Sequence, residues 1–448
     1  MKVQLSAHFT YRKLFMFVIP SIAMMIFTSI YGVIDGLFVS NFVGDTAFAS
    51  INFVMPFIMI LGGFGFIIGT GGSALVTKEI GKGNRDYANQ LFSMLIIFTI
   101  ISGAIIGFLG FVFLKPILTL LGATSEMMGD CLTYGRIIII LSVAFMLQNV
   151  FQSFLAAAEK PQLGLFITIG AGIVNIIFDA LFIVVFNMNV AGAALATVLG
   201  QLFGGFVPFV YFIRPNKSLL KLTKTKFEFM PLLKTFTNGS SEFINNVSSS
   251  ILGMVYNFQL LHYYGKNGVS AYGVIMYVQF IFIAVFIGYS IGTSPIIGYN
   301  YGAGNKKEIN NILKKSLLIT SIGGIILCSL AILLSRTVST LFVGYNQELT
   351  DLSIYAFRLF SLAFIFAGAN IFISGFFTAL NNGYVSGIVS FLRTLVFQMI
   401  CIMVLPILIG KEGIWISQVI AEVLSLTVSV ILLFVYSKKY KYFKYKYS

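Results

Sequence analysis

Apolar runs long enough to cross a membrane recur along the whole 448-residue chain. A helix needs about 20 such residues to span the roughly 30 Å of hydrocarbon in a bilayer. Only 10% of the residues are charged, against about 25% in soluble domains, so most of the surface is expected to face lipid. Membrane β-strands alternate apolar and polar residues over stretches of about ten, which these runs do not. The sequence therefore predicts an all-α integral membrane protein.

Twelve helical spans are predicted. They are 14–38, 51–77, 88–113, 131–155, 164–185, 190–213, 233–261, 270–297, 312–335, 352–379, 386–409 and 412–437. Most of the 29 lysines and arginines fall in the loops on the side that holds both termini. Because basic loops stay in the cytoplasm, both termini are expected there. The net charge of +14 is therefore a topology signal, and no nucleic-acid partner is predicted.

The chain contains a duplication at an offset of 221 residues. The turn sequence Gly-Lys-Gly-Asn-Arg at Gly81–Arg85 returns as Gly-Ala-Gly-Asn-Lys at Gly302–Lys306. The same offset pairs Gly44 with Gly265, Tyr134 with Tyr355 and Gly192 with Gly413. Each repeat holds six spans, so the repeats enter the membrane in the same orientation and form two lobes, 1–214 and 235–448, joined by a basic cytoplasmic linker, 215–234. This organisation is typical of alternating-access transporters.

Polar residues inside the first-repeat spans form a candidate cation site. Ionisable groups in the hydrocarbon are costly and are functional candidates by default. Asp35 lies near the outer end of span 1, and Asp179 lies in span 5 with Asn175 one turn earlier on the same helix face. Thr197 in span 6 lies at a similar depth. Close carboxylates away from water tend to share a proton, so we predict that this set binds H⁺ or Na⁺. The alternative for Asp35 alone is a helix cap or an interfacial pair.

The second repeat carries different polar residues. At the offset of 221, Asp35 becomes Tyr256 and Asp179 becomes Ile400, so the acids are confined to the first lobe. The second-lobe candidates are Glu242, Asn245, Asn246, Arg393 and Glu422. Arg393 and Glu422 suit a structural ion pair. Glu242 has no evident charged partner, and we interpret it as a residue for substrate or a second cation.

No enzyme motif is present, and no cofactor is predicted. The glycine-rich stretch at 62–72 lies inside an apolar span, where a nucleotide-binding loop has no place and close helix packing explains it better. No phosphate-binding loop of the Gly-x-x-x-x-Gly-Lys-[Ser/Thr] type occurs. The three cysteines are scattered and imply no disulfide or metal framework. The expected energy source is therefore an ion gradient or a partner protein. A passive channel would have no need of acids confined to one repeat.

Short motifs in the first repeat resemble the MATE (multidrug and toxic compound extrusion) family, in particular its DinF/MepA-like branch. They are Tyr-Gly-Val-Ile-Asp ending at Asp35, Asn-Ile-Ile-Phe-Asp ending at Asp179, and Val-Ala-Gly-Ala-Ala-Leu-Ala-Thr ending at Thr197. Pro20 lies fifteen residues before Asp35, at the position where members of the branch bend span 1. The resemblance covers essentially the whole chain.

The resemblance implies a V-shaped bundle that exports amphipathic, often cationic compounds in antiport with H⁺ or Na⁺. It implies a monomer in a plasma membrane of prokaryotic type. The implied cation residues are Asp35, Asn175, Asp179, Thr197 and, less directly, Asn149 in span 4. The acid that some relatives carry in span 10 is missing, since that span reads Ala369-Asn370. The alternative in the same superfamily is a flippase for lipids or lipid-linked saccharides, which is expected to have a larger, more basic central cavity.

Overall fold

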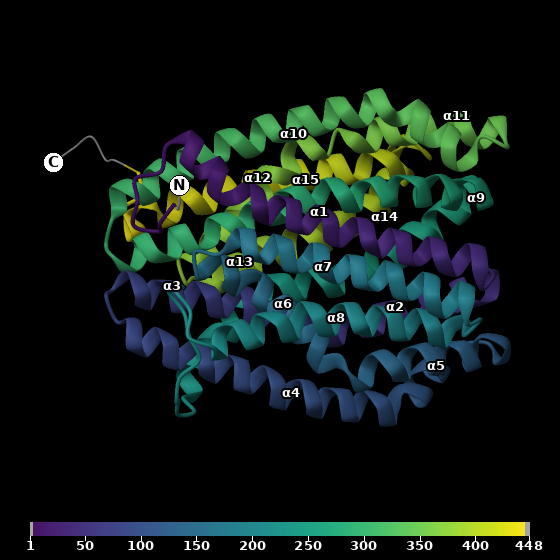
Figure 1. The fold of residues 1–448 in the computed structure, drawn as a ribbon. Coiled ribbons are helices and arrows are strands. Elements are labelled where there is room, and N and C mark those ends of the chain that lie inside the picture. The colour runs from purple at the N-terminus through teal and green to yellow at the C-terminus, as the bar shows by residue number, and fades with distance from the viewer. Residues whose placement is uncertain (1–2, 444–448) are drawn as a thin grey trace.

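The computed structural model describes residues 3–443, and the regular structure in that range is entirely helical (Figure 1). Segments labelled η are π-helical turns. The first half contains α1 Tyr11–Phe42, α2 Asp45–Phe66, η1 Ile67–Gly71, α3 Gly72–Gly81, α4 Arg85–Leu120, α5 Ser125–Ile140, α6 Ser142–Ala157, α7 Pro161–Asp179, η2 Ala180–Val185 and α8 Asn189–Ile213. The second half contains α9 Phe229–Gly302, α10 Lys306–Val343, α11 Gln347–Ser361, α12 Phe364–Ala379, α13 Gly383–Phe391, η3 Leu392–Val396, α14 Phe397–Ile409 and α15 Gly413–Tyr440.

The predicted twelve-span architecture is confirmed within the described residues. Nine helical stretches are long and apolar enough to cross a membrane, and two bent pairs, α5 with α6 and α11 with α12, qualify as one span each. The remaining span is hidden in α9, whose 74 residues contain a non-helical residue, Gly265, with φ of 63°. At 1.5 Å per residue, an unbroken α9 would be far longer than a bilayer is thick. Its two arms are therefore separate spans joined at this kink.

The duplicated glycines occupy equivalent backbone conformations in the two halves. Gly83 and Gly304 both have positive φ, at 87° and 68°, in the turns that follow α3 and α9. Gly44 and Gly265, also paired by the offset, both have positive φ. Such backbone angles strain residues with a side chain. The repeat in the sequence is thus a repeat in local structure.

The two halves contact each other most closely at the end of the bundle that carries both termini, which we call the basic end. A Cβ atom on Gly81 would lie 2.0 Å from the carbonyl oxygen of Tyr299, and one on Gly302 would lie 1.9 Å from that of Lys78. Lys78 and Tyr299 are themselves 221 residues apart, so these are the same contact made twice. The lobes therefore meet across a pseudo-two-fold axis, as subunits of a symmetric dimer do.

The buried hydrophobic clusters also differ between the two ends of the bundle. Two buried clusters near the basic end mix the halves: one joins Leu5, Leu14 and Val18 to Ile296 and Phe376, and the smaller one joins Met24 and Met25 to Ala284 and Ile291. At the opposite end, one cluster around Tyr134 contains only first-half residues, and another around Trp415 contains only second-half residues. The lobes thus share a core at the basic end and have separate cores at the other.

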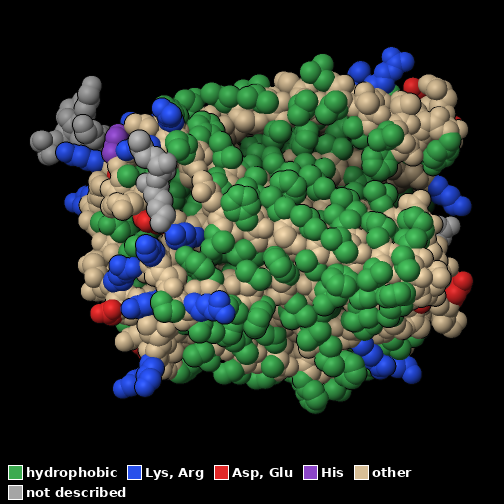
Figure 2. Space-filling view, viewed as in Figure 1, with side chains coloured by type: hydrophobic (Ala, Val, Ile, Leu, Met, Phe, Trp, Pro, Cys, Tyr) green, Lys and Arg blue, Asp and Glu red, His purple; other side chains and the backbone are tan. Residues whose placement is uncertain are grey.

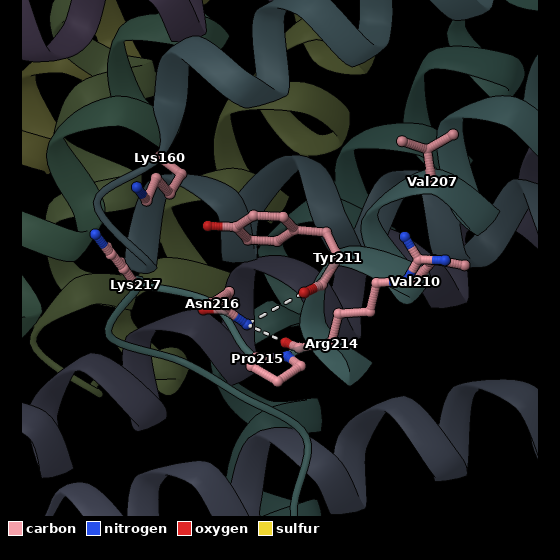
Figure 3. Close-up of a pocket in the computed structure, with 8 residues that line it drawn as sticks. All are labelled: Lys160, Val207, Val210, Tyr211, Arg214, Pro215, Asn216 and Lys217. Carbon is pink, nitrogen blue, oxygen red and sulfur yellow. Dashed lines mark hydrogen bonds between the residues drawn. The ribbon is translucent and has the colours of Figure 1, made fainter.

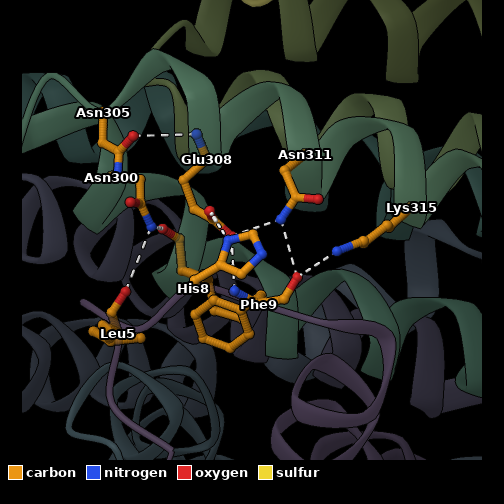
Figure 4. Close-up of polar contacts among 9 residues, drawn as sticks. Leu5, His8, Phe9, Asn300, Asn305, Glu308, Asn311 and Lys315 are labelled. Carbon is orange, nitrogen blue, oxygen red and sulfur yellow. Dashed lines mark hydrogen bonds and ion pairs between the residues drawn. The ribbon is translucent and has the colours of Figure 1, made fainter.

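Two extended segments cross between the lobes at the basic end. The N-terminal strap, residues 3–10, precedes α1 but packs on α10 (Figure 4). There Glu308 accepts from the Phe9 backbone N–H at 2.9 Å and pairs with His8 Nδ1 at 2.7 Å, and Lys315 Nζ donates to the Phe9 carbonyl at 2.6 Å. The Leu5 N–H donates to Glu159 Oε1 of the first lobe at 2.6 Å. This strap therefore ties both lobes together.

The linker strap, residues 214–228, precedes the second lobe but packs on α4 of the first. The Lys221 N–H donates to Asn89 Oδ1 at 3.0 Å, and Tyr87 Oη donates to Glu228 Oε2 at 2.9 Å. The following helix begins at Phe229, so residues 229–234 of the predicted linker are helical. The reason is that Pro231, which suggests a linker in the sequence, lies in the first helical turn, where proline is tolerated.

The outside of the bundle is a belt of apolar side chains. Figure 2 shows hydrophobic residues covering the middle of the visible face, with lysine and arginine gathered toward its two ends. Phe108, Leu333 and Ile407 are among the exposed large side chains, at 69%, 77% and 78% exposure. Such a surface is stable only in lipid. The predicted all-α membrane fold is therefore confirmed.

Candidate functional site

Three helices bring the predicted first-lobe residues together. Asp35 lies on α1, Asp179 is the last residue of α7, and Thr197 lies on α8. Thr197 Oγ1 donates to Asp35 Oδ1 at 3.4 Å. Asn175 and Asp179 also lie close enough to interact electrostatically with the Asp35 carboxyl group. The sequence spacing predicted this convergence, and the four residues form one site.

The carboxyl groups of this site are buried with few partners. Asp179 is 0% exposed and Asp35 is 7% exposed. Within residues 3–443, neither oxygen of Asp179 and neither amide atom of Asn175 has a hydrogen-bond partner. No ion pair in that range includes either aspartate. Because a buried carboxylate without a counter-charge is costly, this geometry suits a group that takes up a proton or a cation.

Uncharged residues around the two aspartates extend the site, and sequence reasoning missed them. The Tyr134 hydroxyl lies near Thr197 and interacts electrostatically with both aspartates. Gln148 Nε2 donates to Tyr31 Oη at 3.4 Å, and Tyr31 is in turn close to Asp35. The Tyr134 hydroxyl and Gln148 Oε1 are buried without a partner in the described chain. The repeat pairs Tyr134 with Tyr355, so the tyrosine was visible as a repeated position but not as a site residue.

Asn149 and Pro20, both implied by the family resemblance, are less directly connected to the aspartates. Asn149 is buried on α6, and its amide nitrogen has no partner in the described range. The backbone carbonyl oxygen of Asn149 faces Gly69 of η1. A Cβ atom added to Gly69 would lie 3.0 Å from this oxygen. Pro20 is buried inside α1, which is one continuous helix from Tyr11 to Phe42. A functional bend at Pro20 stays a prediction.

In the second lobe, Arg393 and Glu422 form a buried bidentate ion pair. Arg393 Nε lies 3.0 and 3.1 Å from the two Glu422 oxygens, and Nη2 lies 2.8 Å from Oε1. Asn370 Nδ2 donates to Glu422 Oε2 at 2.7 Å and to the Glu422 carbonyl at 2.9 Å. Ser429 Oγ then donates to Asn370 Oδ1 at 3.1 Å. Asn370 of span 10 thus completes a hydrogen-bonded network around the ion pair.

Glu242 has a charged residue nearby, although its sequence context suggests that it has none. It lies beside Asn245 and within electrostatic reach of Arg393. Span 11 contributes Arg393 and span 7 contributes Glu242, so only the packing of the two spans reveals their proximity. Asn246 Nδ2 donates to the Glu242 backbone carbonyl at 2.8 Å, whereas Asn245 Oδ1 is buried without a partner in the described range. The second-lobe acids are therefore balanced in part by an arginine.

Rare π-helical turns flank charged residues in both lobes. η2 begins directly after Asp179, and η3 contains Arg393. π-Helical turns are frequent at functional sites because the extra residue reorients neighbouring side chains. The first lobe thus presents two carboxyl groups without a basic partner, and the second presents two carboxyl groups around one arginine. Among residues 3–443, the acids of the first lobe therefore lack the basic partner that the acids of the second lobe have.

Comparison of the chain with known proteins identifies one family. The MatE family model matches residues 20–181 and 243–404, once in each half. The chain is 24% identical over 434 residues to the multidrug export protein MepA of Staphylococcus aureus (strain MSSA476), covering 95% of this chain and 93% of that protein. It also resembles a crystal structure of MATE in complex with MaL6, with a TM-score of 0.91 and 20% identity, covering 97% of this chain and 98% of the other.

A second solved structure has the same fold. It is the outward-facing conformation of a multidrug resistance MATE family transporter of the MOP superfamily. The TM-score is 0.90 at 20% identity, and the match covers 96% of each chain. The family matches begin 223 residues apart, close to the offset of 221 read from the glycine turns. The duplication is therefore visible in the sequence, in the structure and in the two matches of the family model.

Proposed function

The chain belongs to the MATE family of membrane transporters, and on that premise we propose that it exports amphipathic, cationic compounds in antiport with H⁺ or Na⁺. The observation that carries this proposal is that two neighbouring carboxyl groups in the first lobe, those of Asp35 and Asp179, have no basic partner in the described chain. A group that binds a cation reversibly needs acceptors without a permanent counter-charge, and this site supplies them. MepA, named as a multidrug export protein, supports the choice of cargo.

We place the protein in a prokaryotic-type plasma membrane with both termini in the cytoplasm. The basic end is then cytoplasmic, and the lobes, which meet there, close the transport path on the cytoplasmic side. The separate cores at the opposite end support an outward-facing arrangement. In this arrangement, H⁺ or Na⁺ from outside reaches Asp35 and Asp179 on the first lobe.

Coupling requires only that cation and cargo favour different conformations. Cation binding neutralises the aspartates, changes the packing of α1 around Pro20 and weakens cargo binding between the lobes. Cargo leaves to the outside, the lobes rock about their shared core, and the cation dissociates in the cytoplasm. The second-lobe residue Glu242 is a candidate contact for cationic cargo, with part of its charge offset by Arg393.

The test is uptake of an ethidium-like cationic dye into inverted membrane vesicles under an imposed pH or Na⁺ gradient. Asp35→Asn and Asp179→Asn are compared with the parent at matched expression. Asp86→Asn is the control because Asp86 is an exposed aspartate of the same lobe. Both site variants should lose at least about 90% of gradient-driven uptake, and the control should retain it. The gradient that drives uptake identifies the coupling ion.

Two other results would redirect the proposal. Site variants that transport as well as the parent would mean that the coupling site lies elsewhere, with Glu242 the next residue to test. A parent that moves no dye under either gradient would favour the flippase alternative, which a lipid-translocation assay in proteoliposomes then tests. Against that alternative, the buried arginine of the second lobe is already paired with Glu422.

A further inference from the structure

A cavity at the basic end lies between the start of α7 and the end of α8 (Figure 3). Its volume is about 560 Å³. Eight residues line it: Lys160, Val207, Val210, Tyr211, Arg214, Pro215, Asn216 and Lys217. It lies on the outside of the first lobe and shares no residue with the cation site around Asp35 or with the second-lobe charge cluster. Cation binding and transport as described above make no use of it.

The polar lining of this cavity is positively charged and unneutralised. Lys160, Arg214 and Lys217 line it together, and none of them belongs to an ion pair within residues 3–443. In Figure 3, the Lys160 and Lys217 side chains extend on the side toward which the Tyr211 hydroxyl points. Lys160 and Lys217 repel each other there, and an anion between them relieves this repulsion, whereas the Arg214 guanidinium extends on the opposite side of Tyr211. The lining therefore selects an anionic ligand.

Local backbone structure strengthens this preference. Helix α7 begins at Pro161, directly after Lys160, and the positive end of a helix dipole favours an anion. The negative end of α8 is capped within the protein, because Asn216 Nδ2 donates to the carbonyl oxygens of Tyr211 and Arg214, each at 3.1 Å. The acceptors that would repel an anion are thus already occupied.

The apolar residues that line the cavity indicate that the anionic ligand also has an apolar part. Val207 and Val210 belong to α8, a membrane-spanning helix, and neighbouring Phe206 and Ile213 are 61% and 56% exposed on its surface. The cavity therefore has a charged side at the membrane boundary and an apolar side continuous with the lipid belt. We propose that it binds the phosphate headgroup of an anionic phospholipid of the cytoplasmic leaflet, with the acyl chains along α8. The choice of leaflet rests on the topology proposed above.

The test uses the purified full-length protein in neutral detergent, with phosphatidylglycerol, phosphatidylcholine and inorganic phosphate as separate probes. Native mass spectrometry counts bound lipid across a titration of each probe. The cavity variant carries Lys160→Gln, Arg214→Gln and Lys217→Gln. The matched control carries Lys221→Gln, Lys224→Gln and Lys226→Gln, which remove the same amount of charge from the linker strap outside the cavity. Cations near a membrane surface each contribute about 1 kcal/mol to anionic lipid binding.

We expect phosphatidylglycerol to bind the parent and the control at least about tenfold more tightly than it binds the cavity variant. Phosphatidylcholine should bind all three weakly. Equal loss in both triple variants, or loss in neither, would overturn the proposal, because binding would then follow overall charge. Inorganic phosphate that displaces the lipid at equal concentration would overturn the lipid assignment in favour of a free-anion site.

A milder pair of variants guards against misfolding of the triple substitution. Lys217 and Lys224 are both exposed positions of the linker strap, so Lys217→Glu and Lys224→Glu should both fold. Only Lys217→Glu should weaken phosphatidylglycerol binding, again by about tenfold or more. Equal binding to the two variants would contradict the proposal. Dye transport measured in parallel keeps this result separate from the test of the proposed antiport.

Discussion

Asp179 is fully buried, and neither of its oxygens has a hydrogen-bond partner in the described chain. A residue in this position adds little to stability, because no basic partner in the described chain offsets the desolvation of its carboxyl group. We therefore predict that Asp179→Asn, which we expect to abolish transport, keeps the free energy of unfolding within about 1 kcal/mol of the parent or raises it. Thermal unfolding of the purified protein in detergent checks this. A large loss of stability would instead make Asp179 a structural residue.

The Arg393–Glu422 pair should behave in the opposite way. Removing one partner of a buried ion pair leaves an uncompensated charge and costs about 3–5 kcal/mol. Glu422→Leu and Arg393→Met should each lower the melting temperature strongly. The combined variant Arg393→Met with Glu422→Leu should recover much of the loss, since Asn370 still donates to the residue-422 carbonyl. Additive losses in this double-mutant cycle would show that the pair is not coupled.

Sequence reasoning identified charged site residues well and uncharged ones poorly. Asp35 and Asp179 stand out because a carboxyl group inside an apolar run is rare, and the family motifs select Asn175 and Thr197. Tyr134 and Asn370 do not stand out, because polar uncharged side chains are common in membrane helices. Their roles depend on which face of one helix meets which face of another. That pairing is a property of packing, and one sequence does not contain it.

At the scale of helices, the glycine contacts at the basic end make a specific prediction. In Gly302→Ala the new methyl group would lie 1.9 Å from the Lys78 carbonyl oxygen, so the lobes must move apart. An overpacked contact costs about 1–3 kcal/mol, enough to shift a conformational equilibrium at least about fivefold. A Thr77→Cys reporter, buried at this contact, should then react faster with a thiol reagent by that factor.

The control for this experiment is Gly253→Ala, which adds the same methyl group to α9 at a position with no atom within 4 Å. It should leave the Thr77→Cys labelling rate unchanged. The repeat provides a second check, because Gly81→Ala places its methyl group 2.0 Å from the Tyr299 carbonyl oxygen. It should act like Gly302→Ala. Unchanged labelling in both would show that this contact does not limit opening.

The helices themselves were largely predictable, and most of their irregularities were not. Apolar length alone placed the twelve spans, because a bilayer requires long apolar helices. The 57° bend between α5 and α6 and the 44° bend between α11 and α12 have no such signature. The π-helical turns have no such signature either. The kink in α9 was predictable, because the predicted spans 233–261 and 270–297 lie on either side of Gly265. Pro231 misled the prediction of the linker because proline suits a helix start as well as a loop.

For the whole molecule, the distribution of basic residues predicts which end faces the cytoplasm. A cysteine replacing exposed Lys266, at the end opposite the termini, should react with a membrane-impermeant thiol reagent added to intact cells. A cysteine replacing exposed Lys224 should react only after permeabilisation. The native cysteines, Cys131, Cys328 and Cys401, are all buried and should give little background. The reverse labelling pattern would invert the topology and the transport direction argued from it.

The N-terminal strap has a consequence for how the protein is made. Asn300, Glu308 and Lys315, which hold Leu5 and Phe9, leave the ribosome about 300 residues after them. At about 5–20 residues per second, the strap waits roughly 15 to 60 seconds for its binding partners. The linker strap meets a helix already inserted, since Asn89 precedes Lys221. The N-terminal strap thus reaches its final place long after it is synthesised, because its contacts to the second lobe form only once that lobe has followed.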